Sequence, residues 1–547
     1  MRSILYLILS LLSIFVFLGV FYYAYIFETD SHDHTNVVSE VTPTQPSEKT
    51  TTQQNVAPTK DALISSMERT SLLAGLEWPA PNKIVSSVNE STDATKCSYE
   101  VINLQENYTI GSFVNVLVVA RDANGLAKTH GGDFFQAKLY NSQLKASTFG
   151  FVMDHNNGTY TVQFSLLWYG PAHVSILLVH SSEAVQVLRK QRDQDPDKVI
   201  FYGYFKDGTI TEQVVCNALQ SPWLVGDSKS CCCKYRDPVT EESWFCRRPS
   251  SLPCYAFSQH SMGRYQANLS SLESSLLNEN REKVVLGKDP VINVLPQDTV
   301  KRETRRCQPG LDTPVPAGFY FQDRWTSVVC NSQAFSTAML ISDCLKNKQV
   351  HMMGDSTLRQ WFEYLVETVP TLKRLNLYTS ALSGPLEAVD LQNNYVIRWR
   401  SHGIPFRTTK TPVADLHYIA RQTDDLAGGR HIVVVITIWA HFTTYPVDIY
   451  MRRVATIRRS ILSLLQRAPD TLVLIKSANT GFKDVYGSDW LSWQLDLILR
   501  TMFRSLPVAF IDVWQMTSCH YSPDNIHPPK EVVRNEVDLF LSFVCPQ

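Results

Sequence analysis

Two kinds of hydrophobic pattern divide the chain. Four stretches alternate apolar and polar positions: residues 113–120, 134–139, 157–164 and 172–180. Alternation with a period of two is typical of strands that bury one face, and turn sequences such as Asn157-Gly158 border these stretches. Short strands at this spacing predict an immunoglobulin-like or filamin-like β-sandwich of about 100 residues.

The C-terminal part of the chain has a different pattern, in which short apolar runs alternate with helical stretches. The apolar runs are residues 349–353, 431–438, 472–476 and 508–513, and the helical stretches are residues 357–368, 448–466 and 490–504. Alternation of strand and helix predicts a parallel sheet with helices on both faces, an α/β domain. In such a sheet the active site lies at the carboxyl ends of the strands.

The N-terminal pattern predicts a membrane anchor. Residues 4–27 carry no charge. This stretch is long enough to cross a bilayer, and it is longer than the apolar region of a signal peptide. Arg2 precedes this stretch and acidic residues follow it, so the positive-inside rule predicts a type II signal-anchor. Secretion after signal cleavage is the alternative. Residues 31–75 are rich in Ser, Thr, Pro, Gln and charge, which predicts a disordered stem.

Composition places the chain in the secretory pathway. It has 547 residues, twelve cysteines and a formal net charge of −1, which gives no indication of nucleic-acid binding. Six cysteines between residues 216 and 254 predict a disulfide-stapled connector and not a metal site, and their pairing stays open. Adjacent cysteines 231–233 are not expected to pair with one another. Four sequons predict N-glycosylation at Asn89, Asn107, Asn157 and Asn268.

Two separate segments carry candidate chemistry. Ser356 follows an apolar run and a Gly354-Asp355 turn, and a helical stretch begins after it. This arrangement presents a serine at the top of a strand, where the N–H groups of a helix point at the same place. Near the C-terminus, Asp524 precedes His527 by three residues and can orient an imidazole that deprotonates a serine. Cys519 and Cys545 flank this loop, and their position suggests a disulfide between them.

Together these segments resemble one protein family. The paired motifs are Gly-Asp-Ser-x-x-Arg-Gln-Trp at residues 354–361 and Asp-Asn-x-His-Pro-Pro at residues 524–529. The C-terminal part resembles the neurexophilin and PC-esterase domain (NXPE) family and SGNH-type (GDSL-like) esterases. The upstream sandwich, with Gly-Gly-Asp-Phe-Phe at residues 131–135, is similar to the neurexophilin-like half of that family. The expected domains are residues 1–30 (anchor), 31–75 (stem), 76–205 (neurexophilin-like sandwich), 206–305 (Cys-rich connector) and 306–547 (PC-esterase, SGNH-like).

The resemblance implies roles for individual residues. Ser356 would be the nucleophile, His527 the general base and Asp524 the residue that orients it. SGNH enzymes supply oxyanion donors from a Gly and an Asn in middle loops, but this chain has Trp-Ala-His at residues 439–441. The candidate donors are therefore Gly403, His441 and Asn479. Arg359 and His402 are candidate substrate-binding residues. Arg359 also has a structural interpretation as a residue of the helix, and Asp355 has one as the cap of that helix.

The resemblance also predicts a function. It implies a glycan O-acetyltransferase of the Golgi lumen, with sialic acid as a candidate acceptor, acetyl-CoA as acyl donor and no bound cofactor. Two alternatives remain: a carbohydrate O-acetyl esterase, and an inactive glycoprotein that binds a protein partner through the sandwich. The expected partners are a glycan or glycoprotein acceptor and, through residues 4–27, the membrane; no nucleic acid or metal is expected.

Overall fold

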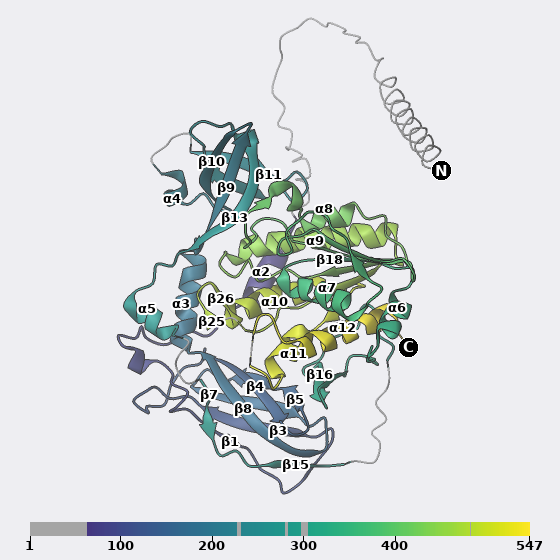
Figure 1. Cartoon of the computed structure of the whole chain (residues 1–547). Coiled ribbons are helices and arrows are strands. Elements are labelled where there is room, and N and C mark those ends of the chain that lie inside the picture. Colours follow the sequence, from purple (N-terminus) through teal and green to yellow (C-terminus); the bar gives the residue numbers. More distant parts are fainter. Residues whose placement is uncertain are drawn as a thin grey trace, which may run out of the picture. The chain divides into compact units, whose positions relative to one another are not determined.

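The computed structural model describes residues 63–226, 231–278, 283–296, 305–481, 483–523 and 525–546. They belong to one compact unit, Ala62–Gln547 (Figure 1). The expected anchor at residues 4–27 and most of the expected stem lie outside the described residues. No helix in the described ranges is both long and apolar enough to cross a membrane.

The N-terminal half contains two sheets that share a core. The first has the order β14 (Leu286–Gly287), β1 (Ser98–Val101), β3 (Phe113–Val119), β7 (Thr159–Ser165) and β6 (Phe151–Asp154). The second has the order β17 (Arg324–Ser327), β16 (Gly318–Phe321), β5 (Ala146–Phe149), β4 (Phe134–Asn141), β8 (Gly170–His180), β15 (Ile292–Leu295) and β2 (Tyr108–Thr109). The four strands predicted from period-two alternation are confirmed as β3, β4, β7 and β8. Their alternate apolar residues, including Val116, Leu139, Tyr160 and Ile176, are fully buried between the sheets.

A third sheet occupies most of the segment expected to be a connector. Its order is β11 (Cys232–Arg236), β12 (Ser243–Arg247), β10 (Ile210–Asn217), β9 (Val199–Asp207), β13 (Phe257–Tyr265) and β22 (Thr411–Pro412). Disulfides Cys216–Cys246 and Cys233–Cys254 cross-link it, which confirms the stapled character of this region. Cys231 bonds to its neighbour Cys232, so the expectation that adjacent cysteines do not pair was wrong.

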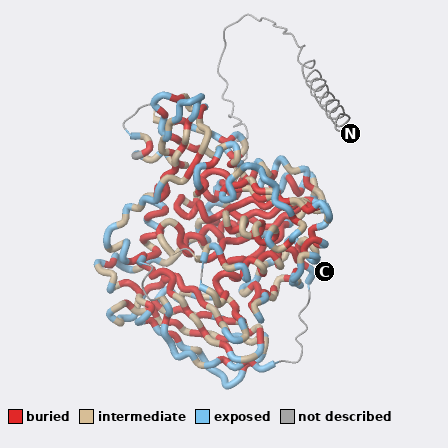
Figure 2. Tube along the Cα trace, in the orientation of Figure 1, coloured by how far each residue is buried: buried red, intermediate tan, exposed pale blue. Residues whose placement is uncertain are grey.

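The C-terminal sheet contains both strand directions. Its order is β19 (Lys373–Arg374), β20 (Leu386–Asp390), β21 (Tyr395–Arg400), β18 (Gln349–Met353), β23 (Ile432–Ile436), β24 (Leu472–Lys476) and β27 (Ala509–Ile511). The strands from β21 to β27 run parallel, whereas β19, β20 and β21 pair antiparallel. Every residue of β23 is buried, and Figure 2 shows buried residues concentrated through this sheet.

Helices contact this sheet and the sandwich. The longer ones are α3 (Ser182–Asp193), α7 (Ser356–Thr368), α9 (Val447–Arg467), α10 (Asp489–Phe503) and α12 (Lys530–Val544). Shorter helices are α4 (Pro222–Val225), α5 (Ser271–Leu276), α6 (Ala338–Leu345), α8 (Ile419–Asp424) and α11 (Val513–Cys519). The helices predicted at residues 357–368, 448–466 and 490–504 are confirmed as α7, α9 and α10.

The expected fold class was wrong. The described chain is built mainly from antiparallel and mixed sheets, and its C-terminal sheet is not the parallel α/β arrangement of SGNH enzymes. Strands β20 and β21 explain the error. They alternate buried and partly exposed residues, as in an antiparallel hairpin, and so do not form the continuous apolar runs from which the parallel strands were predicted.

The end of the expected stem is also ordered. Helix α2 (Ser66–Ala74) lies within residues 31–75 and buries Leu72. Arg69 forms an ion pair with Asp448 at 2.8 Å, and Glu68 pairs with Arg458, so both charges are satisfied by helix α9. Composition predicted disorder because this segment is polar, but its charges are complementary to a distant helix.

The sandwich is continuous with the C-terminal part of the chain. Strand β16 pairs with β5, and Tyr320 in β16 donates its hydroxyl hydrogen to the carbonyl of Met516 at 3.2 Å. Gln136 in β4 donates to the buried carboxylate of Asp489 at 3.0 Å. The two halves therefore share buried polar contacts, which a flexible linker would not provide.

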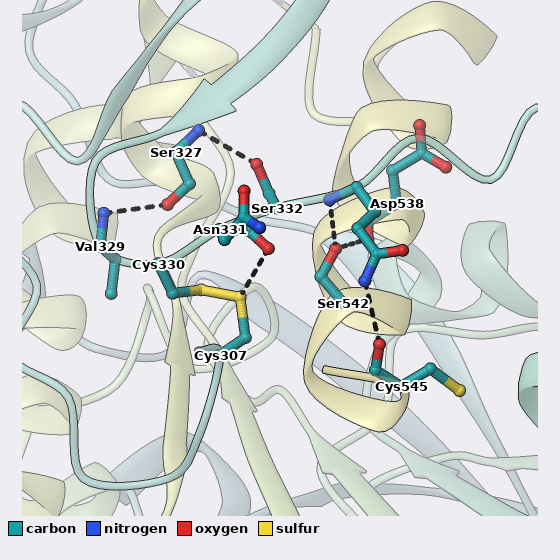
Figure 3. Close-up of a disulfide and its surroundings, with 10 residues drawn as sticks. Cys307, Ser327, Val329, Cys330, Asn331, Ser332, Asp538, Ser542 and Cys545 are labelled. Carbon is teal, nitrogen blue, oxygen red and sulfur yellow. Dashed lines mark hydrogen bonds between the residues drawn. A yellow bond between two sulfur atoms is a disulfide. The ribbon is translucent and has the colours of Figure 1, made fainter. Parts of the chain in front are cut away.

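Two disulfides secure the lead-in and the C-terminus of the described chain. Cys307–Cys330 closes a loop of 23 residues beside helix α12 (Figure 3). The backbone N–H of Gln333 donates to the hydroxyl of Ser542 at 2.9 Å. Cys344 in α6 bonds to Cys545 across 201 residues. The suggested Cys519–Cys545 bond was wrong: Cys519 is a buried free thiol, and the fold brings Cys344 to the end of α12 instead.

Removing the long-range disulfide should lower stability measurably. We expect Cys344→Ala/Cys545→Ala to cost about 2–5 kcal/mol, because the bond restricts a long loop in the unfolded chain. The measurement is thermal unfolding of the purified full-length chain. Cys519→Ala, which keeps all five disulfides, is the control. Peptide mapping without reduction must recover a Cys344–Cys545 peptide; a Cys519–Cys545 peptide would contradict the pairing.

Candidate functional site

The turn after strand β18 places Ser356 at the start of a helix. Gly354 allows two strands to approach closely here, since an added Cβ would lie 2.5 Å from the carbonyl oxygen of Thr437. Asp355 caps helix α7, with its Oδ1 accepting from the N–H and the hydroxyl of Thr357 at 3.0 and 2.7 Å. Ser356 is the first residue of α7, so its own N–H has no partner within the helix.

The structure brings Ser356 and His527 together. Ser356 Oγ lies 2.8 Å from His527 Nε2, although 171 residues separate them. Partial removal from water lowers the pKa of His527, and the charge of Asp355 opposes this shift. The imidazole is therefore neutral at pH 7, as a general base must be. Asp524, the expected orienting carboxylate, lies outside the described residues.

Two side-chain amides fasten the loop that carries His527. Asn479, after strand β24, donates to the carbonyl of Ile526 at 2.9 Å. Gln360, in helix α7, donates to the carbonyl of Pro528 at 3.3 Å. These contacts lie on either side of His527 and hold its backbone. Asn479 was expected as an oxyanion donor, but in the structure its amide N–H binds this loop.

A buried lysine supports Asn479. Lys476 ends strand β24 and is fully buried. Its Nζ donates to Asn479 Oδ1 at 2.5 Å and to Thr357 Oγ1 at 3.1 Å, which connects the two segments of the site from below. Burial lowers the pKa of Lys476, and the carboxylates of Glu536 and Asp355 oppose that shift. Sequence reasoning missed this residue, and its only signal is a lysine at the end of an otherwise apolar strand.

Gly481 is a second residue that the sequence interpretation missed. Its φ is +133°, and an added Cβ would lie 2.2 Å from the backbone nitrogen of Ile526. Because the clashing atoms belong to the backbone, no side-chain movement relieves the contact. The close approach of residue 481 therefore determines where the His527 loop can lie.

Two histidines form a buried pair at the ends of β21 and β23. His402 Nε2 lies 2.8 Å from His441 Nδ1, and the backbone N–H of Arg407 approaches the same Nδ1 at 3.4 Å. A backbone N–H can only donate, so Nδ1 of His441 is an acceptor and His402 Nε2 carries the shared hydrogen. Neutral His441 then carries its own hydrogen on Nε2.

The environment keeps both imidazoles neutral. Burial, with Arg453 nearby, lowers the pKa of His402 to about 3. Burial and the neighbouring His402 lower the pKa of His441 well below its ordinary value, and His527 is near enough to contribute. His402 is fully buried, and its Nδ1 has no hydrogen-bond partner among the described residues. It therefore lies behind His441 and not at the surface where a substrate would bind.

The remaining candidates lie at the same edge but have other contacts. Gly403 is buried with a φ of +84°, and an added Cβ would meet the carbonyl of His417 at 3.2 Å. Arg359 donates to Glu363 Oε1 at 3.0 Å and to the carbonyl of Leu382 at 2.8 Å. Its guanidinium is thus committed to contacts within the protein, as its structural interpretation predicted.

Comparison with protein families identifies the chain. Residues 65–270 match the Neurexophilin family model, and residues 325–545 match the model of the NXPE family member 4-like C-terminal domain. Together these matches cover more than half of the chain. The protein belongs to the NXPE family. The second match gives the C-terminal domain, which contains both Ser356 and His527, a PC-esterase-like relation.

Solved structures add no argument about this NXPE protein. The Escherichia coli adhesin FdeC matches at 14% identity with a TM-score of 0.14, covering 37% of this chain and 65% of its own. The bacterial integrin-binding protein invasin matches at 9% identity with a TM-score of 0.13, covering 57% of this chain and 60% of its own. This chain thus spans less than two thirds of either structure.

A Cβ at position 481 should displace His527. We expect Gly481→Ala to slow labelling of Ser356 by a fluorophosphonate probe by about tenfold or more, because a misplacement of about 1 Å can cost 100-fold in a positioned reaction. Mass spectrometry of the labelled Ser356 peptide measures the rate. Gly125→Ala is the matched control, since Gly125 also has positive φ (+83°) but open space around it. Equal labelling of both variants would contradict the role of this contact.

Proposed function

We propose that this protein is an O-acetyltransferase that forms an acetyl-enzyme on Ser356 and passes the acetyl group to a glycan hydroxyl. The 2.8 Å contact between Ser356 Oγ and the neutral imidazole of His527 carries the proposal. A serine hydroxyl is a weak nucleophile by itself, and a neutral imidazole within hydrogen-bond reach activates it. The PC-esterase-like relation of the domain supports acyl chemistry at this serine.

The proposed reaction has two halves that use the same base. In the first, His527 Nε2 takes the proton of Ser356 Oγ while Oγ attacks the carbonyl carbon of the donor. The tetrahedral intermediate collapses, and the leaving group departs with that proton. In the second half, His527 takes the proton of an acceptor hydroxyl, whose oxygen attacks the acetyl carbon. Ser356 leaves as the new ester forms and recovers its proton from His527.

The developing oxyanion needs hydrogen-bond donors at this edge. The N–H of Ser356 is one, because it is the first residue of α7. His441 Nε2–H is the second, since His402 and the backbone of Arg407 leave that hydrogen on Nε2. Its neighbour Ala440 approaches Asp355 Oδ2 at 3.5 Å, next to the nucleophile. His441 is therefore the proposed second donor to the oxyanion.

The proposed setting is the lumen of the secretory pathway. Five disulfides support an oxidising compartment, and Asn89, Asn107, Asn157 and Asn268 are all exposed, as glycosylation requires. We propose a Golgi enzyme with type II topology. Sialic acid is the proposed acceptor and acetyl-CoA the proposed donor, both by analogy with glycan O-acetyltransferases.

An acetyl esterase is a second candidate function, favoured by one observation. The side chain of His527 is exposed and that of Ser356 is partly exposed, so water reaches the place where an acetyl-enzyme would form. Water that attacks the acetyl group gives hydrolysis, whereas a bound sugar hydroxyl gives transfer. The two activities change glycan acetylation in opposite directions, which makes them separable in one experiment.

Overexpression of the wild-type chain should raise O-acetylation of cell glycans. We expect Ser356→Ala to abolish this rise, because it removes the acetyl-carrying oxygen. Mass spectrometry of released sialylated glycans measures the effect, and Ser380→Ala, an exposed serine of the same domain, is the control. A fall with the wild type indicates an esterase. Identical acetylation with wild type and Ser356→Ala would contradict catalysis and favour a binding module.

Loss of the His441 donor should slow the chemical step. We expect His441→Ala to lower kcat by about 100- to 1,000-fold with a smaller change in KM, as for the loss of one oxyanion donor. Steady-state kinetics with an activated acetyl ester measure both constants. His431→Ala, at the opposite end of strand β23, is the control and should leave kcat unchanged. An unchanged kcat in His441→Ala would exclude this residue as a donor.

A further inference from the structure

A polar cavity lies close to the sheet edge that carries Ser356. It has a volume of about 370 Å³ and lies between one face of strands β18 and β21 and helix α8. We call it the arginine pocket and define it by its titratable lining residues: His351, Arg398, Arg400, His417, Arg421 and Asp425. In the parallel register His351 lies beside Arg398 and Met353 beside Arg400, so these side chains share one face of the sheet.

The three arginines of the pocket differ in their partners. Arg398 binds Glu387 through two contacts of 3.1 Å. Arg421 binds Asp237 at 3.2 Å. The guanidinium of Arg400 forms no hydrogen bond or ion pair with any residue that the structure describes, although it is partly buried. Asp425 adds a carboxylate to the lining without an ion pair to Arg400. Arg400 thus offers a planar set of N–H donors to the cavity.

His351 adds a second unpaired polar group. Its Nε2 is buried and has no hydrogen-bond partner in the described part of the chain. Burial, with the charges of Arg398 and Arg400, lowers the pKa of His351 to about 4. The imidazole is therefore neutral at pH 7 and can donate a hydrogen bond without adding charge. A buried polar atom without a partner destabilises the folded protein, and a ligand that pairs with it would offset this cost.

These features select a class of ligand. A guanidinium matches the geometry of a carboxylate or phosphate, because two parallel N–H groups face two oxygens. The volume is within the range of about 300–1,000 Å³ that small-molecule sites occupy. We propose that the arginine pocket binds the carboxylate or phosphate group of a small anionic molecule, with Arg400 as its principal contact.

The position of the pocket connects it to the proposed reaction. Met353 lines the pocket and precedes Ser356 by three residues, and Gly354 donates its N–H to the carbonyl of Arg400 at 3.0 Å. If the proposed function holds, the anionic group belongs to the acceptor, as a sugar carboxylate, or to the donor, as a phosphate. Binding to the pocket does not itself require Ser356 to be a nucleophile.

Equilibrium binding with three probes tests the proposal. The full-length chain with Ser356→Ala is titrated calorimetrically with N-acetylneuraminate, coenzyme A and inorganic phosphate, so that no turnover contributes heat. We expect saturable binding of at least one probe, weakened about tenfold or more by Arg400→Gln, in line with the loss of a charged hydrogen bond. Arg374→Gln in strand β19 removes the same charge from an exposed position and is the matched control.

Each outcome has a defined meaning. N-acetylneuraminate binding that depends on Arg400 assigns the pocket to a sugar carboxylate, and coenzyme A or phosphate binding assigns it to a phosphate. Failure of all three probes to bind at millimolar concentrations overturns the proposal, as does equal weakening by Arg374→Gln and Arg400→Gln. Thermal unfolding of each variant confirms folding. Because Ser356 is absent from every arm, the result is independent of the glycan acetylation experiment.

Discussion

The contact between Ser356 and His527 depends on a loop that has no regular structure of its own. Residues 525–528 lie between helices α11 and α12, where no strand or helix ladder holds them. The side-chain amides of Asn479 and Gln360 bind the backbone on either side of His527. Gly481, which has no Cβ, lets the turn after β24 approach the backbone of Ile526 closely. The imidazole is positioned because two segments, helix α7 and the turn after β24, contact the same four residues. The proposed catalytic role of this pair requires that surrounding contacts hold its geometry.

The interior below this loop is unusually polar, and that polarity has a physical use. Lys476 is fully buried but joins Asn479 to Thr357, so one ammonium group connects both halves of the site. One nitrogen of His402 has no partner among the described residues, while its other nitrogen sets the tautomer of His441. Burying such groups destabilises a fold unless they are satisfied. Local rules are broken in this way most often at functional sites, where the lost stability is offset elsewhere.

The pattern of hydrophobic and polar positions predicted many strands and helices correctly, but only where the periodicity was strong. Short apolar runs such as residues 472–476 and alternating stretches such as Phe113–Val119 appear in the structure as strands close to the predicted bounds. The hairpin of β20 and β21 was missed, and with it the mixed character of the C-terminal sheet. Helix α2 was missed because polar composition indicated disorder, whereas its ion pairs join it to helix α9. The hairpin is local, because β20 pairs with β21 across a short turn, whereas the partners of helix α2 lie far away in sequence.

The sequence by itself determined the local parts of the candidate site. The Gly354-Asp355 turn presents Ser356 at a helix start because glycine permits close approach and aspartate caps the helix, and both properties are local. Only the tertiary structure decided which groups surround that serine. In the fold, Asn479 binds the carbonyl of Ile526 and Arg359 binds Glu363. Cys344 forms its disulfide with Cys545. The tertiary structure also placed Arg400 in a cavity without an ion pair to any described residue. The Asn479–Ile526 and Cys344–Cys545 contacts span 47 and 201 residues, and no local pattern encodes pairings over such distances.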